Sequence, residues 1–231
     1  MSHVLIIVSL IMVCTTIAGC RAIGSSENSG KGIKNRVGLP SPRTVGTMSV
    51  EEALFRRRSV REYSPQSLTL EEVSQLLWAT QGVTSSQRGF RTAPSAGATF
   101  PMEIYLVVSR VDGLASGLYR YDPYENSVQM EVEGDLSRKL ARAALDQYWV
   151  SEAAVNLVIA AVYERTTMRY GERGIRYVHM EAGHIGQNVY LQAEALGLGT
   201  VVVGAFHDEQ VKKVLKIKEE PLYIMPVGRR R

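Results

Sequence analysis

Cysteine is almost absent from this chain of 231 residues, and the two that occur, Cys14 and Cys20, both stand near its beginning. Residues 21–231 therefore cannot hold a disulfide framework, a cysteine-ligated zinc or iron–sulfur site, or a cysteine nucleophile. Histidine is also scarce, and the histidines that follow residue 100 lack the paired spacing of a metal-binding helix. We therefore expect no catalytic metal.

Two nucleotide-binding signatures are missing as well. No G-x-G-x-x-G turn follows the first predicted strand, which disfavours a dinucleotide-binding fold, and no glycine-rich loop carries the lysine of a nucleoside triphosphatase. No segment of about 20 to 50 residues recurs, so we expect no repeat architecture. Residues 50–231 are long enough for one α/β domain with a hydrophobic core.

Charged side chains are lacking from residues 1–19, an apolar segment that is too short for a comfortable transmembrane helix and is typical of a secretory signal. The sequence IAGC at 17–20 resembles the cleavage site of bacterial lipoproteins, which predicts that the signal peptide is removed and that Cys20 receives a lipid. An uncleaved N-terminal anchor is the alternative, and the absence of Lys or Arg before the apolar run weakens both hypotheses. We expect an exported lipoprotein anchored in a membrane of the cell envelope.

Gly, Ser, Pro, Lys and Asn are frequent in residues 20–49, and apolar periodicity is weak there, which predicts a flexible tether. Residues 50–231 alternate between helical and strand patterns, and a hairpin pattern around residues 122–126 prevents a purely parallel sheet. We expect an α/β (α+β) domain with a mixed, largely antiparallel sheet, helices on both faces, and a loop over residues 83–101. The predicted helices are 50–58, 69–79, 135–145, 175–196 and 208–215, and the predicted strands are 102–109, 117–122, 127–134, 154–163, 199–206 and 222–228.

The formal net charge of +4 is modest, but arginines cluster at residues 56–61 and at residues 229–231. A solvated face, contact with anionic lipid and nucleic-acid binding are the general explanations of such clusters. A more specific one is a single bound phosphate, because several guanidiniums beside a hydroxyl can satisfy its oxygens with charge-assisted hydrogen bonds. In an extended segment, Arg57, Ser59 and Arg61 would lie on one side. From charge alone, a basic surface turn remains the alternative.

Residues 94–98, with the sequence PSAGA, carry hardly a functional side chain and precede a strongly apolar strand. Such a loop suits a flat, heteroatom-rich ligand, because backbone groups can reach the ring edges where small side chains let the ring lie close. An ordinary turn is the alternative. Gly204 and Ala205 end another strand and could present bare amides in the same way, and the PVG at 226–228 is followed at once by the terminal arginines. Together these features imply a planar cofactor that carries a phosphate.

The motifs of this chain, in their order along the sequence, resemble those of the FMN-dependent nitroreductase superfamily, and most closely its SagB-type dehydrogenase branch. The resemblance covers nearly all of residues 50–231. It depends on the order and spacing of several motifs, since no single motif is decisive. The motifs are RRSVR at 57–61, the loop from Pro94 to Pro101, EAGHIGQNVYLQAEALGLG at 181–199, GAF at 204–206 and PVG at 226–228.

The resemblance implies a three-layer α-β-α sandwich and an enzyme that uses FMN. In such an enzyme the arginines and the serine would hold phosphate and ribityl oxygens, and residues 94–98 would line the isoalloxazine ring. An amide of Gly204 or Ala205 would lie near flavin N5, where hydride arrives or leaves. The implied cofactor-binding residues are Arg57, Arg58, Ser59, Arg61, Pro94, Ser95, Ala96, Gly97, Ala98, Gly204, Ala205, Arg229 and Arg230.

The SagB-type branch also implies a Lys-Tyr pair that acts as catalytic acid and base, and the matching positions here are Arg169 and Tyr170. Arginine cannot release its proton near neutral pH, whereas a lysine can be tuned to do so. This departure counts against azoline oxidation. Tyr170 is the one candidate catalytic residue, as a donor or as a substrate-positioning group, and a structural tyrosine is the alternative.

We expect an FMN-dependent oxidoreductase that transfers electrons between NADH, NADPH or another donor and a nitro, quinone or related small organic acceptor. The alternatives are a SagB-type azoline oxidase of modified peptides, a flavin- or small-ligand-binding lipoprotein without turnover, and a protein whose arginines bind anionic lipid. The resemblance implies a homodimer. Small residues such as Gly183 and Gly186 would let a second subunit approach the long helix, although a close contact within the chain would also use them. We expect membrane contact through the lipid and no nucleic-acid partner.

Overall fold

A seven-stranded sheet, in the order β1-β6-β5-β4-β7-β9-β8, forms the centre of the computed structural model, which describes residues 36–231. Neighbouring strands of this sheet are antiparallel throughout. The predicted signal segment and Cys20 lie outside the described residues. The strands are β1 (Arg36–Gly38), β4 (Met102–Val108), β5 (Gly117–Asp122), β6 (Ser127–Glu133), β7 (Val155–Ala161), β8 (Leu198–Thr200) and β9 (Glu220–Arg229).

The central strands β4 and β7 are buried along their whole length, as their continuous apolar sequences require. Side chains alternate between the two faces of the sheet. On β4, Ile104 and Leu106 join the core on one face, and Tyr105 and Val107 join the core on the other. Strands of this kind need a layer of helices on each side.

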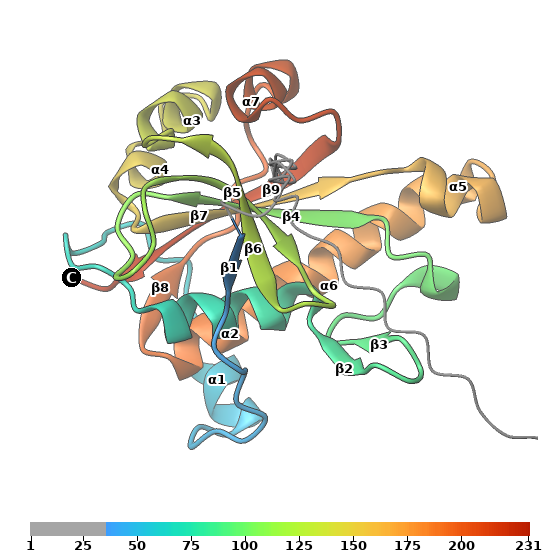
Figure 1. Ribbon diagram of the computed structural model, residues 1–231, viewed down its shortest axis with the longest axis horizontal. Helices are drawn as coiled ribbons and strands as arrows, with labels where there is room; N and C mark the ends of the chain where they lie inside the picture. The colour runs from blue at the N-terminus through green and yellow to red at the C-terminus, as the bar shows by residue number, and fades with distance from the viewer. Residues whose placement is uncertain (1–35) are drawn as a thin grey trace, which may run out of the picture. The chain divides into compact units, whose positions relative to one another are not determined.

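Helices provide both layers, as Figure 1 shows, with α1, α2 and α6 on one face and α3, α4 and α7 on the other. The predicted three-layer sandwich with a mostly antiparallel sheet is therefore confirmed. Helix α5 lies beyond the ends of the central strands β4 and β7, next to α6. The helices are α1 (Val50–Arg56), α2 (Leu70–Gln81), α3 (Ser137–Ala143), α4 (Tyr148–Glu152), α5 (Glu164–Tyr170), α6 (Arg173–Ala195) and α7 (Asp208–Leu215).

Two of the predicted helix boundaries have clear local causes. Helix α2 begins with the expected capping box, in which the backbone amide of Glu72 donates to Thr69 Oγ1 at 3.2 Å and the backbone amide of Thr69 donates to Glu72 Oε2 at 2.8 Å. Helix α6 ends where Gly197 takes a left-handed φ of 70°, which favours glycine.

The predicted tether, residues 20–49, differs from the structure in its described part. Strand β1 pairs with β6 at the edge of the sheet. The following residues lie against α2, where the backbone amide of Arg43 donates to Gln75 Oε1 at 2.8 Å and Ser74 Oγ donates to the Pro40 carbonyl at 2.6 Å. These contacts are made through backbone groups and leave no apolar period in the sequence, which is why the composition suggested a tether.

The predicted loop over residues 83–101 also contains short ordered elements. Strands β2 (Val83–Ser85) and β3 (Phe90–Arg91) pair in a small antiparallel ribbon, and a 3₁₀ turn, η1 (Ala96–Ala98), follows. Two- and three-residue elements carry too little periodicity to be predicted from sequence. Helix α5 was likewise not predicted.

Within residues 36–231, no helix is both long enough and apolar enough to cross a membrane. The same residues contain no group of three or more His, Cys, Asp or Glu side chains arranged to hold a metal ion.

Candidate functional site

Residues 57–61, which we call the arginine–serine segment, lie beside the chain that follows α6. Arg57 is the residue at which α1 ends, and its backbone amide donates to the Ala53 carbonyl at 2.9 Å. The chain then runs next to Thr200 at the end of β8, where Ser59 forms an isolated parallel bridge and the amide of Val60 donates to the Thr200 carbonyl at 2.9 Å. Two motifs that are 140 residues apart in the sequence are thereby joined.

Tyr190 of α6 links the two motifs through its hydroxyl. The backbone amide of Val202 donates to Tyr190 Oη at 2.9 Å, which leaves the tyrosine proton available for Ser59 Oγ, also at 2.9 Å. The Arg57 guanidinium carbon lies 5.3 Å from the centre of the Tyr190 ring, within the range of a cation–π contact. Tyr190 is not among the predicted site residues, and its only signal in the sequence is a tyrosine on a helix otherwise rich in small residues.

Arg58 and Arg61 take other directions. Arg58 Nη1 donates to the carbonyls of Phe55 and Arg57, at 2.9 and 2.8 Å. The Arg61 guanidinium carbon lies 5.5 Å from the ring centre of Trp149 on α4. The expectation that Arg57, Ser59 and Arg61 share one side of an extended segment therefore holds for the first two only, because Arg61 turns toward a helix on the other face of the sheet.

The charges of this segment are not neutralised by the protein. Among the described residues, none of Arg57, Arg58 and Arg61 forms an ion pair with a carboxylate, whereas the neighbouring Arg56 pairs with Glu52 at 2.8 Å. Unpaired guanidiniums beside a serine hydroxyl make a donor set that suits a phosphate. On this observation the residues fit the anionic end of FMN.

The C-terminal arginines differ from this segment because their side chains are already paired with carboxylates. Arg229 donates to Glu72 at 3.0 Å and to the Ser67 carbonyl at 3.2 Å. Arg230 makes a short ion pair with Glu194 and donates to the Leu198 carbonyl at 3.1 Å. A phosphate that reached them would have to share their hydrogen bonds. The role of Arg229 and Arg230 in cofactor binding remains a prediction.

Gly204 and Ala205 are exposed in the loop after β8. The loop begins at Val203, which is bonded to Ile224 of β9 in both directions. Ala205 offers its carbonyl to Gln147 Nε2 at 2.8 Å, but within residues 36–231 neither amide, of Gly204 or of Ala205, donates to a protein acceptor. Two N–H groups without a protein acceptor therefore lie in an exposed loop just after the Tyr190–Val202 bond.

Buried Tyr63 fixes the end of the arginine–serine segment. Its hydroxyl donates to the carbonyl of Val60 at 2.7 Å and lies 3.2 Å from that of Pro226. Burial raises the pKa of Tyr63, and the nearby Tyr190 raises it further, while Arg61 opposes the rise. The phenol therefore stays neutral and serves as a hydrogen-bond donor that ties the segment to β9.

The backbone-lined loop holds an unusual conformation. Gly97, Ala98 and Phe100 have left-handed φ values of 59°, 54° and 45°. For residues other than glycine this conformation costs about 1–3 kcal/mol each and persists only where the surroundings enforce it. Ser95 Oγ accepts a hydrogen bond from the Phe100 amide at 2.9 Å, which closes the loop on itself.

Arg169 and Tyr170, at the end of α5, both contact this loop. Arg169 Nη1 donates to the Gly97 carbonyl at 3.0 Å. A Cβ atom on Gly97 would lie 2.5 Å from the Tyr170 hydroxyl, so the phenol lies directly over the glycine. The resemblance to the SagB-type branch singled out these two residues, and the structure places both in contact with the loop.

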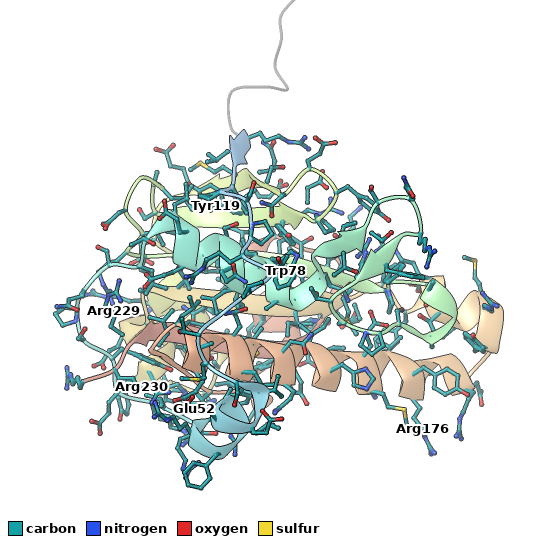
Figure 2. The ribbon with its side chains drawn as sticks, turned by 90° about the horizontal axis from the view of Figure 1, so that it is seen from below. Glu52, Trp78, Tyr119, Arg176, Arg229 and Arg230 are labelled. Carbon is teal, nitrogen blue, oxygen red and sulfur yellow. The ribbon has the colours of Figure 1, made fainter. Side chains whose placement is uncertain are left out.

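Within one chain, the loop and the arginine–serine segment contact different parts of α6. The loop lies next to Glu181, while Arg57 and Ser59 meet Tyr190, nine residues further on and therefore about 14 Å away along the helix. In Figure 2, Arg176 lies toward one end of α6 and Arg230 toward the other end. The predicted cofactor residues thus form two groups on one chain.

Both groups include residues exposed to solvent, among them Ser59 and Gly204 in one group and Gly97 and Ala98 in the other. One cavity of about 420 Å³ lies beside β4 and β5, and another of about 470 Å³ lies between α1, α2 and α6. Neither of these two cavities is lined by any of the predicted cofactor-binding residues. These residues of the candidate site are therefore open to solvent in the single chain.

The protein is a three-layer sandwich whose surface carries guanidiniums without carboxylate partners and backbone amides without protein acceptors among the described residues. The sequence profile of the Nitroreductase family matches residues 54–229, and the chain therefore belongs to the nitroreductase family. Members of this family are oxidoreductases and typically depend on a flavin.

Individual relatives agree with this assignment. MJ1384 of Methanocaldococcus jannaschii, which carries the family's name, is 54% identical over 186 residues and covers 80% of this chain and 93% of the relative. A crystal structure of a protein from Ralstonia eutropha, named after the same family, is 31% identical with a TM-score of 0.75 and covers 86% of this chain and 90% of that chain.

A more distant relative supports the SagB-like branch. McbC of Escherichia coli, a microcin B17-processing protein, is 26% identical over 148 residues, which are 60% of this chain and 54% of McbC. The fold is also shared by the NADPH:FMN oxidoreductase of Vibrio harveyi, determined in complex with NAD+, which is 21% identical with a TM-score of 0.56 and covers 78% of this chain and 68% of that chain.

Proposed function

We propose that this protein is an FMN-dependent oxidoreductase that passes two electrons from a reduced nicotinamide, or another donor, to a nitro, quinone or related small organic acceptor. The observation that carries the proposal is the Tyr190 hydroxyl, which joins Ser59 to Val202 and so brings unpaired cations close to free amides. A phosphate and the redox-active edge of a ring are the two parts of FMN that need such partners.

Bound FMN would supply the redox chemistry, and the residues of this chain would hold and orient it. Arg57 and Ser59 are the groups for the phosphate and ribityl oxygens, since they lie together at Tyr190. Gly204 and Ala205 offer amide donors that no protein group uses among the described residues. Donors fixed in this way need no reorganisation when charge develops beside them.

A homodimer would complete the site. The loop at residues 94–98 is about 14 Å along α6 from the arginine–serine segment of its own chain. The loop of a second copy could instead cover the open surface around Tyr190. The face of α6 that includes Gly183 and His184 is exposed and available for that contact. The dimer is part of the proposal and is tested by sedimentation of the purified protein.

Azoline oxidation of modified peptides is the second candidate, and the similarity to McbC favours it. The side chains near the loop favour it less. Arg169 stands where the branch has a lysine, and its guanidinium donates to the Gly97 carbonyl at 3.0 Å, so it holds the loop and cannot transfer a proton near neutral pH. Tyr170 is the remaining candidate for a proton donor.

The visible absorption spectrum of the purified full chain tests the flavin hypothesis. The two absorption bands of an oxidised flavin are expected, and their absence after incubation with FMN and removal of the unbound FMN would rule out the flavin hypotheses and leave a protein that binds another small ligand or anionic lipid. Loss of the bands with reduced nicotinamide under anaerobic conditions, and their return on addition of a quinone, is expected for the oxidoreductase. A passive flavin-binding protein would keep its bands unchanged.

The membrane attachment is a separate proposal. Cys20 lies in the sequence IAGC, and we propose that it carries the lipid of an exported lipoprotein. Incorporation of labelled fatty acid into the wild-type chain, and its loss in Cys20→Ala, is the expected result. Equal labelling of the two chains would overturn this proposal without affecting the flavin hypothesis.

A further inference from the structure

The loop at residues 94–100 is held in part by Gln81, Arg91 and Glu181, which were not among the predicted site residues. Three of the four residues from Gly97 to Phe100 have left-handed φ values, and two of these three are not glycine. A conformation of this kind persists only where neighbouring groups over-determine it. The neighbouring groups on the inner side of the loop are polar and largely buried.

One end of the strained segment, Phe100, is fixed by two side chains. Ser95 Oγ accepts the hydrogen bond from the Phe100 amide at 2.9 Å. The Arg91 guanidinium carbon lies 4.2 Å from the centre of the Phe100 ring, which is a close cation–π contact. Ser95 and Arg91 therefore hold the same phenylalanine through its backbone and through its ring.

Gln81, the last residue of α2, connects Arg91 to Glu181. Its Nε2 donates to Glu181 Oε1 at 2.9 Å, and its Oε1 accepts a hydrogen bond from Arg91 Nη1 at 3.3 Å. The Ser95 side chain also lies beside Glu181. These five residues therefore form a ring of neighbours, from Ser95 through Glu181, Gln81, Arg91 and Phe100 and back to Ser95.

Glu181 is the costly member of this ring. Only 2% of its surface is exposed, although it stands on α6 among positions that pack against α2. A buried carboxylate destabilises the fold unless it is paired and hydrogen-bonded. Burial raises the pKa of Glu181, while the hydrogen bonds from Ser95 and Gln81 and the charge of Arg91 oppose that rise. An apolar residue would serve packing better, so the carboxyl group has another use.

We propose that Glu181 and Gln81 are positioning residues, and that the closed ring they form with Ser95, Arg91 and Phe100 holds the 94–100 loop in the shape that receives the flavin ring. The receiving role rests on the proposed function, whereas the ring itself does not. Neither residue would touch the cofactor through this arrangement. Both act through the backbone of the loop.

Amide hydrogen exchange at Phe100, followed by NMR on the full chain without added FMN, tests the positioning role. Ser95→Ala removes the acceptor and defines the unprotected rate. Glu181→Ala and Gln81→Leu are expected to bring Phe100 toward that rate. Gln75→Leu is the matched control, because Gln75 is also buried on α2 but bonds to Gln192 and the Arg43 carbonyl, and it should leave Phe100 protected.

Wild-type protection of Phe100 in a folded Glu181→Ala chain would overturn the proposal. If that chain does not fold, Glu181→Gln provides the test, because it keeps the side-chain shape. The glutamine can bond only one of its two partners through its remaining oxygen, so partial loss of protection is expected and full protection is the contrary result.

The affinity for FMN tests the receiving role. Glu181→Ala, Gln81→Leu and Ser95→Ala are each expected to raise the Kd about tenfold, and the Glu181→Ala/Ser95→Ala double variant should be no weaker than the weaker single variant, because one ring is broken once. Gln75→Leu should bind as the wild type does. If the wild type itself bound no FMN, the proposed function would fail while the exchange experiment still decided the ring. Faster exchange with unchanged affinity would overturn the receiving role alone.

Discussion

The hydroxyl of Tyr170 lies 2.5 Å from the point that a Cβ atom on Gly97 would occupy, so the end of α5 covers the loop at a position where only glycine fits. Gly97 also has a φ of 59°, a second reason for glycine. Gly97→Ala is therefore expected to lower the free energy of unfolding by about 2 kcal/mol or more.

Gly89 supplies the control for that substitution. It has a similar φ of 66°, but nothing lies within 4 Å of its absent Cβ. Gly89→Ala should cost only the backbone term, about 1 kcal/mol. Urea unfolding of the two variants measures the difference, and equal losses would mean that Tyr170 does not constrain the loop.

Ala98 has a φ of 54°, and glycine adopts this conformation without steric cost. Ala98→Gly is therefore expected to raise the free energy of unfolding by about 1 kcal/mol, less the entropy that glycine adds to the unfolded chain. Ala96 begins the same turn without a positive φ, and Ala96→Gly should lower it by about 0.5–1 kcal/mol. Opposite signs in thermal or urea unfolding are the expected outcome, and the same sign for both would show that the loop is relaxed.

The long elements and their order were predictable because their patterns are strong. The apolar run of β4 and the capped stripe of α2 determine their own types, and the layers follow from strands that are apolar on both sides. Strand β1 was missed because it has three residues and pairs through its backbone. Composition alone describes such a segment as a tether.

The site was predictable only where a motif lies on a loop. Arg57 and Gly204 stand out in the sequence because an arginine cluster and a segment of small residues contribute little to a hydrophobic core. Tyr190 and Glu181 do not, because each is a single polar residue on a long helix, and its partner lies more than 80 residues away or in another layer. Periodicity shows which face of a helix is buried, but the bonds of a buried polar group depend on the tertiary fold.

The Ser59–Tyr190 bond gives a prediction for cofactor binding. Ser59→Ala and Tyr190→Phe are each expected to raise the Kd for FMN about threefold to tenfold, because each loses a hydrogen bond of the same junction. The double variant should bind FMN more weakly than either single variant. Its increase in Kd should, however, be smaller than the product of the two single increases. Titration of the apoprotein with FMN, followed by flavin fluorescence, measures all three values.

Tyr119→Phe is the control for this cycle. Tyr119 likewise forms a hydrogen bond through its hydroxyl, which donates to the Ala115 carbonyl at 2.8 Å, but it is buried on β5, away from the junction. Its loss should reduce stability and leave the FMN affinity unchanged. If Tyr119→Phe weakened FMN binding as much as Tyr190→Phe, the effect would come from general destabilisation.

Adjacent arginines distinguish a phosphate site from a merely basic surface. Arg57 has no carboxylate partner among the described residues, while Arg56 is exposed and pairs with Glu52 at 2.8 Å. Arg57→Ala is expected to raise the Kd for FMN about tenfold to a hundredfold, and Arg56→Ala to leave it within about twofold. Riboflavin, which lacks the phosphate, should bind the wild type and Arg57→Ala alike. A loss of riboflavin affinity in Arg57→Ala as large as the loss of FMN affinity would show that Arg57 does not act on the phosphate.

The pH dependence of stability reports on Glu181. Burial holds the pKa of this carboxyl above its ordinary value of 4.5 in the folded protein, so the folded state binds the proton more tightly than the unfolded state. The stabilising contribution of the protonated group is complete below 4.5 and is lost as the pH rises through the folded pKa. Glu181→Gln cannot lose a proton, and the stability of this variant relative to the wild type is therefore expected to increase over that interval.

Urea unfolding of both chains at a series of pH values from acid to neutral measures this difference. Arg91 is the charged side chain that faces Glu181, and Ser95 and Gln81 are its neutral partners. Arg91→Gln should therefore push the interval to higher pH, because it removes the one charge that favours the ionised form. A difference between Glu181→Gln and the wild type that stayed constant with pH would show that the carboxyl group titrates alike in the folded and unfolded chains, and that burial does not control it.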